Sequence, residues 1–248
     1  MVGRTVTVMT ACLFMAGMSP AQSGSWGDVL GEVAPPPDAR TGDGGAGEAT
    51  AAALAGGVKE TLRLAATRTV ERVGTEGGYA GDPEIRIPLP RALREVRGTL
   101  KQIGMGGVAD TLEARMNEAA ERAAPKARDI LVETAMAMEL ADARAIVTGP
   151  DDAATQYFRR TAGDEVRAAL RPEIERELDA AGVGELYTTM LDAYDKVPFL
   201  PAMEADIPAY TTKKAVKGIF HYMAREEARI RADPAARTSD LISTVFGG

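Results

Sequence analysis

The chain has 248 residues, with 29 Lys and Arg against 36 Asp and Glu, and a formal net charge of −7. Its length suits one domain or at most two. The acidic balance argues against general nucleic-acid binding, which requires clustered Lys and Arg. Aromatic residues make up only 5% of the sequence, and abundant alanine and leucine favour helices over β-sandwiches and barrels. We therefore expect an all-α protein without a nucleic-acid partner.

The first 21 residues are typical of a secretory signal peptide. Arg4 supplies the positive charge, and residues 6–18 form a mostly apolar run that is too short for a membrane span. Small residues then favour cleavage after Ala21. The less favoured alternative is a lipoprotein modified at Cys12, which would truncate the apolar run. We expect a periplasmic protein released by cleavage, with no membrane span.

Cleavage after Ala21 would remove the one cysteine of the chain. The mature protein would then have no disulfide, no thiolate metal site and no cysteine nucleophile. Residues 22–47 are rich in Gly, Pro and small polar residues. Such a segment buries too little apolar surface to offset the entropy lost on ordering, so it is predicted to be a flexible leader.

Residues 48–248 are predicted to form a single-domain, all-α bundle of about eight helices, because apolar residues recur at three- and four-residue spacing. The expected helices are 48–73, 92–102, 108–123, 125–138, 141–147, 150–161, 164–180, 184–194 and 207–231, with a final turn at 241–246. The helix at 125–138 is apolar almost all round, which predicts that it is buried inside the bundle.

The segment 74–90 is the one non-helical insert with a pattern of its own. Ile85, Ile87 and Leu89 alternate with Arg86 and two prolines. Two prolines exclude a central β-strand. We expect an extended, Pro-containing strap that lays its apolar side on the helices while Arg86 points away. A substrate-binding edge is the alternative.

The densest run of polar groups lies between residues 142 and 161. Gly149 is predicted to end one helix in the left-handed conformation, and Pro150 to begin the next. Asp151 and Asp152 would then meet the positive end of the helix dipole.

The new helix is predicted to have an apolar face, with Ala154, Tyr157, Phe158 and Thr161 among its members, and a polar face. The polar face carries Asp152, Thr155, Gln156, Arg159 and Arg160. It is either a solvated face or a preorganised cluster of acid, amide and guanidinium groups that binds a ligand.

The last long helix is predicted to bury a carboxylate. Glu226 falls within the apolar face formed by Met223 and Ile230, while Glu227 is expected outward. A buried carboxylate requires a cation. We expect Arg159 or Arg160 as that cation, with Arg86 and Arg237 as further candidates. The candidate ligand-binding residues are therefore Asp152, Gln156, Arg159, Arg160, Glu226 and Arg86.

Three segments carry a resemblance to a known family: residues 149–161, GPDDAATQYFRRT; residues 85–90, IRIPLP; and residues 210–246, which contain RIRADPAART. They are similar to the bacterial family of domain of unknown function 4197 (DUF4197). The resemblance covers about residues 48–247. It implies an exported, helical, single-domain protein, and it implies no reaction, ligand or catalytic residue.

The chain offers few residues for chemistry that needs histidine or cysteine. The one histidine, His221, is expected on the polar side of the last helix, which argues against a Ser-His-Asp triad and against zinc. No cofactor motif is present. We therefore favour a non-catalytic periplasmic binding or interaction module for a small ligand, a lipid or an envelope protein. The alternatives are a hydrolase or lyase that uses only Asp, Glu and Arg, and an oxygen-ligand metal site near Asp151 and Asp152.

Overall fold

The computed structural model describes residues 45–195, apart from 103 and 105, and residues 205–232. These residues form helices joined by turns and irregular segments, and no β-strand occurs among them. The all-α prediction is confirmed. The predicted signal peptide, most of the predicted leader and the final turn at 241–246 lie outside the described residues.

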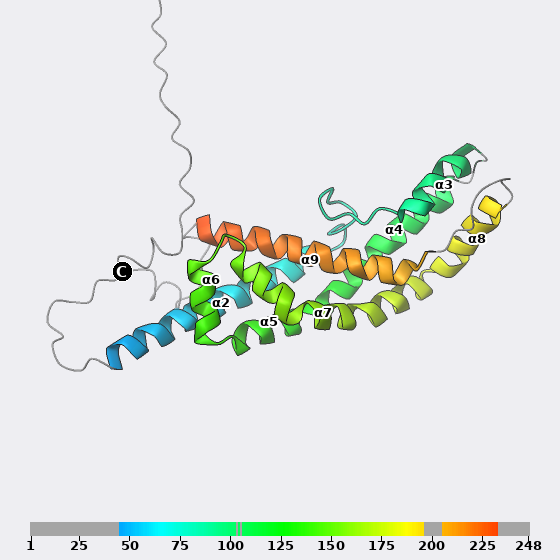
Figure 1. The fold of residues 1–248 in the computed structure, drawn as a ribbon. Coiled ribbons are helices and arrows are strands. Elements are labelled where there is room, and N and C mark those ends of the chain that lie inside the picture. The colour runs from blue at the N-terminus through cyan, green and yellow to red at the C-terminus, as the bar shows by residue number, and fades with distance from the viewer. Residues whose placement is uncertain (1–44, 103, 105, 196–204, 233–248) are drawn as a thin grey trace, which may run out of the picture.

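The helices assemble into an elongated bundle (Figure 1). They are α2 (Gly45–Val73), α3 (Arg91–Gln102), α4 (Gly106–Ala123), the short 3-10 helix η1 (Ala124–Lys126), α5 (Ala127–Ala137), α6 (Leu140–Thr148), α7 (Ala153–Ala180), α8 (Val183–Asp195) and α9 (Ile207–Ala232). At one end α2 packs against α5, α6 and α9, while at the other end α3, α4 and α8 pack together. The long helices α7 and α9 run side by side and connect the two ends.

Helix α7 corrects the prediction of two shorter helices at 150–161 and 164–180. It runs without a break from Ala153 to Ala180 and holds Pro172 inside it. Gly163, at the predicted boundary, is buried within the helix, and a Cβ built on it would lie 3.9 Å from the Phe220 ring of α9. Pro172 is exposed, and water can therefore satisfy the carbonyl that lacks its helical donor.

Helix α5 lies on the outside of the bundle, contrary to the expectation of a buried helix. Only Ala127, Leu131 and Ala135 are buried on it. Met136 has 51% of its surface exposed. The apolar run of this helix is wider than the stripe that α2 and α7 cover, and the excess faces solvent.

The segment 74–90 crosses the bundle between α2 and α3. It makes turns through residue 85 and has no regular structure from residue 86 to residue 90. Ile85, Ile87 and Leu89 are buried, whereas Arg86 is exposed. This alternation brings the apolar side chains into the core and leaves the polar backbone to be satisfied by other groups.

Candidate functional site

The predicted polar face of α7 is exposed. Asp152, Gln156, Arg159 and Arg160 all face solvent. The Gln156 side chain donates a 2.8 Å hydrogen bond to the Asp152 carboxylate. The Arg159 guanidinium lies 5.7 Å from the centre of the Phe220 ring. The structure therefore brings the acid and the amide together, while Arg159 packs against an aromatic ring of α9.

The structure reverses the predicted positions of two threonines of α7, one expected on the polar face and the other on the apolar face. Thr155 is buried and Thr161 is exposed, although the sequence predicted the reverse. Thr155 is buried because its hydroxyl and its backbone N–H both meet a carboxylate of α9. Arg86, from the segment 74–90, pairs at 2.7 Å with the largely buried Glu113 of α4.

Glu226 does not occupy the position predicted for it. Its side chain is 16% exposed, and its partner is Arg229 of the same helix at 2.6 Å, where Arg159 or Arg160 was expected. The buried carboxylate of α9 is the next residue, Glu227. The reason is geometric: at about 100° per residue both positions fall near the apolar face, and the approach of α7 selects the side that carries Glu227.

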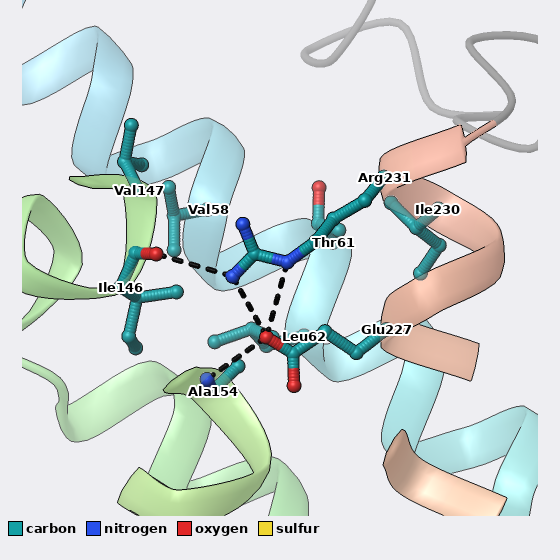
Figure 2. Close-up of a pocket in the computed structure, with 9 residues that line it drawn as sticks. All are labelled: Val58, Thr61, Leu62, Ile146, Val147, Ala154, Glu227, Ile230 and Arg231. Atoms are coloured by element: carbon teal, nitrogen blue, oxygen red, sulfur yellow. Dashed lines mark hydrogen bonds and ion pairs between the residues drawn. The ribbon is translucent and has the colours of Figure 1, made fainter. Parts of the chain in front are cut away.

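Glu227 caps helix α7 from a distance in sequence (Figure 2). One carboxylate oxygen accepts the backbone N–H of Ala154 at 3.0 Å, and the other accepts the N–H and the hydroxyl of Thr155, both at 2.8 Å. The Arg231 guanidinium donates to the first oxygen at 2.8 Å and to the Ile146 carbonyl at 3.2 Å. These bonds satisfy donors that a helix N-terminus leaves without partners.

Asp152, at the N-cap position of α7, makes no side-chain cap. The Glu227 and Arg231 side chains are 5% and 4% exposed. A charge so far from water requires a partner of opposite sign and further hydrogen bonds, and this pair has both. The four-residue spacing of Glu227 and Arg231 was the signal in the sequence, since residues at that spacing face each other on a helix.

A small cavity adjoins the pair. It measures about 10 Å³, which is room for about one water molecule. Its walls come from α2, α6, α7 and α9 and are mostly apolar: Val58, Thr61, Leu62, Ile146, Val147, Ala154, Glu227, Ile230 and Arg231. The arrangement holds four helices together and leaves no space for an organic ligand.

Gly149 lies between α6 and α7, and the reason for a glycine there differs from the predicted left-handed conformation. Its φ is −86° and its ψ −178°, which is extended and not left-handed. A Cβ on it would come within 2.6 Å of the Ala145 carbonyl and 2.9 Å of the Ala153 side chain. Glycine is required here by close approach, which lets α7 begin directly beside the end of α6.

A second polar site holds the segment 74–90 against α4. Glu121, which is buried, accepts the backbone N–H groups of Gly77, Tyr79 and Ala80 at 3.1, 2.9 and 2.9 Å. One helical turn earlier, Asn117 accepts from the N–H of Ile87 and donates to its carbonyl, both at 2.8 Å, as a neighbouring strand would.

Glu113 lies a further turn back and pairs with Arg86. The four-residue spacing of Glu113, Asn117 and Glu121 puts all three on one stripe of α4. The sequence analysis missed this stripe, because a polar residue at a core position looks the same in a sequence as one that faces solvent.

Helix α9 anchors the other side of this segment. Tyr79 is fully buried and donates from its hydroxyl to the Ala215 carbonyl at 2.7 Å. Its ring lies so close to Gly218 that a Cβ there would come within 2.5 Å of it. Burial raises the pKa of the Tyr79 hydroxyl far above its ordinary value, so the group stays neutral and donates.

Further along α9, Tyr222 donates from its hydroxyl to the Asp82 carboxylate. The Arg72 guanidinium donates to the same hydroxyl at 3.0 Å and lies 4.2 Å from the centre of the ring. The hydrogen bond from Tyr222 lowers the pKa of Asp82, and burial raises the pKa of Tyr222. Both shifts keep the carboxylate charged and the phenol protonated.

His221 is half-buried and lies 3.0 Å from the Glu84 carboxylate, which also pairs with Arg225. Hydrogen bonds from His221 and Arg225 lower the pKa of Glu84. An open hollow of about 300 Å³ borders Arg72 and Asp82. Its lining is mostly exposed and is made of glycines and of polar or charged side chains: Arg72, Thr75, Glu76, Gly77, Gly78, Gly81 and Asp82.

Among the described residues, no group of three or more His, Cys, Asp and Glu side chains is placed to hold a metal ion. In the same part of the chain, no helix combines the length and the apolar character that a membrane crossing needs. The polar clusters that do exist hold backbone donors and one another.

Comparison of the chain with curated proteins and with solved structures gave no match. Comparison with protein families gave a match over residues 48–247. This range includes the polar face of α7, the segment 74–90 and the whole of α9. The chain belongs to the family described as "Protein of unknown function (DUF4197)".

Proposed function

We propose that this chain is a non-catalytic binding or interaction module of the periplasm that meets its partner at its surface. Its body is one single-domain bundle, with residues 85–90 as a strap across the helices. It reaches the periplasm by cleavage of the signal peptide at residues 1–21. The partner is a lipid surface or an envelope protein.

The main support for this proposal is the small size of the buried cavity. Small-molecule sites are concave pockets of roughly 300–1,000 Å³ with mainly apolar walls and a few polar groups. The apolar cavity beside Glu227 is about 10 Å³. The larger hollow at the segment 74–90 has a largely exposed, polar and glycine-rich lining. Neither combines the volume with the walls that would enclose an organic ligand.

The use of the buried carboxylates supports the same proposal. A catalytic acid or base needs a proton-transfer position within reach of a substrate. The oxygens of Glu227 accept hydrogen bonds from α7 and Arg231, and those of Glu121 accept hydrogen bonds from three backbone N–H groups. The oxygens of both carboxylates therefore already accept hydrogen bonds from the protein itself, which leaves them poorly placed to exchange a proton with a substrate.

Native mass spectrometry of the protein purified from the periplasm tests the proposal. We expect a polypeptide that begins at Gln22 and carries no small molecule in stoichiometric amount. A lipid on Cys12, or an intact Met1, would refute the proposed export. A stoichiometric organic ligand would refute the surface role. Turnover of ester, peptide or phosphoester substrates that is lost in Asp152→Asn would show an enzyme instead.

A further inference from the structure

The outward face of α9 carries three lysines close together. At about 100° per residue, Lys213, Lys214 and Lys217 all point within about 60° of the direction opposite the fully buried Ile219. Lys213 and Lys217 are exposed and Lys214 is half-buried. Their spacing of three and four residues makes them neighbours on the helix surface.

These lysines differ from the other cations of the same helix. Arg225 pairs with Glu84, and Arg229 pairs with Glu226. Within the described part of the chain, no carboxylate lies within ion-pair distance of the three lysines. Three positive charges on one helix face therefore have no described counter-charge, although the chain as a whole is negative.

Tyr210 lies near these lysines on α9. The Lys214 ammonium lies 5.6 Å from the centre of the Tyr210 ring. Tyr210 itself is half-buried. We call Lys213, Lys214 and Lys217 the basic patch.

We propose that the basic patch binds the phosphate headgroups of an anionic lipid bilayer. This inference rests on the proposed surface role and names its partner. Each Lys or Arg near an anionic membrane surface strengthens binding by about five-fold, and juxtaposed basic residues act together. The half-buried Tyr210 beside Lys214 has the amphipathic character of aromatic residues found at membrane interfaces.

A lipid surface fits the patch better than a protein partner does. Protein interfaces are depleted of lysine and centre on aromatic or aliphatic anchors. In the described part of the chain, Met136 of α5 is the large hydrophobic side chain that stands exposed, and it is not on α9. Lysine is a point charge on a flexible stem, which suits mobile phosphates more than a fixed carboxylate pattern.

The negative charge of the rest of the chain does not prevent this binding. At about 0.1 M salt the Debye length is about 10 Å, so charges farther from the membrane than that are largely screened. The patch would therefore act locally, with this face of α9 towards the bilayer. Binding is expected to weaken strongly as the salt concentration rises.

Vesicle co-sedimentation of the exported protein tests the inference. One set of vesicles is pure phosphatidylcholine, and the other contains phosphatidylglycerol as well. We compare the wild type with the double variant Lys213→Gln/Lys217→Gln. The matched control, Arg128→Gln/Arg144→Gln, also removes two exposed positive charges. Circular dichroism checks that all three proteins have the same helix content.

We expect binding to the anionic vesicles alone, reduced about 25-fold in the patch variant, which is five-fold for each lysine, and changed less than two-fold in the control. Equal binding to both vesicle types, or an equal loss in the control, would overturn the inference. No binding to either type would also overturn it. In that case, an envelope-protein crosslink to α9 that the patch variant loses would leave the surface role standing.

Discussion

Glu227 and Glu121 are buried carboxylates that stabilise this bundle in different ways. Glu227 and Glu121 each accept backbone N–H groups from a part of the chain far away in sequence. Glu227 meets a helix N-terminus and is neutralised by the buried Arg231. Glu121 meets a loop, and within the described part of the chain no cation lies within ion-pair distance of it.

The difference teaches what each carboxylate holds. Loss of the Glu227 charge would remove the carboxylate that faces a buried guanidinium and would leave helix α7 without this cap, so it should affect the whole fold. Loss of the Glu121 charge would leave N–H groups that include those of Gly77, which is half-buried, and Ala80, which is exposed. Water can reach these groups when the loop moves, so the damage should remain local.

The largest effect is expected for Glu227→Gln. This change leaves the Arg231 charge buried and weakens two or more hydrogen bonds, which should reduce the free energy of unfolding by about 3 kcal/mol or more. The adjacent Glu226→Gln is the matched control, because its partner Arg229 is half-exposed and a helical pair of this kind contributes about 1 kcal/mol at most. Urea denaturation measures both. Equal losses in the two variants would show that burial of the Glu227 pair does not matter.

A smaller effect is expected for Glu121→Gln. The amide retains one acceptor oxygen and turns a donor towards the loop, so the loss should be about 2 kcal/mol. Hydrogen exchange should show faster exchange at Gly77, Tyr79 and Ala80, while the amides of α7 stay protected. Equally fast exchange throughout the bundle would mean that the loop and the core unfold as one unit, and the contrast with Glu227 would fail.

A pH titration sharpens the comparison at the loop. The folded-state pKa of Asp82 is below its ordinary value of 3.8. Its stabilising contribution is therefore present above that ordinary value and is lost as the pH falls through the lower, folded-state value. The destabilisation caused by Asp82→Asn should be full at pH 6 and should shrink as the pH falls below the ordinary value of 3.8. A difference that does not change with pH would show that the Asp82 charge plays no part.

The smallest effect is expected on the exposed face of α7. Gln156→Ala removes one hydrogen bond to Asp152 at an exposed position, so unfolding should change by less than about 0.5 kcal/mol. Thermal denaturation measures this, with Thr155→Ala as the buried neighbour that should lose more. A loss in Gln156→Ala as large as in Thr155→Ala would indicate a structural role that the described contacts do not contain.

The sequence predicted much of the architecture. Periodicity identified the long helices α2 and α9 but divided α7 into two. The alternation at Ile85, Ile87 and Leu89 identified the buried positions of an irregular segment. The location of buried charge was wrong by one residue, at Glu226 instead of Glu227. Periodicity defines an apolar face only to within about half a turn, and the choice between neighbours depends on which helix approaches.

The partners of the buried groups depend on tertiary contacts still more. Asp151 and Asp152 were predicted to place negative charge at the start of this helix, but the carboxylate that bonds its first N–H groups comes from α9. The stripe on α4 carries polar residues at core positions because a loop supplies backbone donors there. Neither fact follows from local sequence, since each requires two segments to be placed side by side.

The anchoring role of α9 has a consequence for folding. Helical proteins usually fold quickly because most of their contacts are local in sequence. Here the hydrogen bond from Tyr79 to Ala215 spans 136 residues, and that from Tyr222 to Asp82 spans 140. The cap on Thr155 spans 72. Closing such loops costs entropy before the contacts form. During synthesis, these contacts therefore cannot form before α9 has been made. Until then the start of α7 and the segment 74–90 lack the hydrogen bonds that α9 supplies.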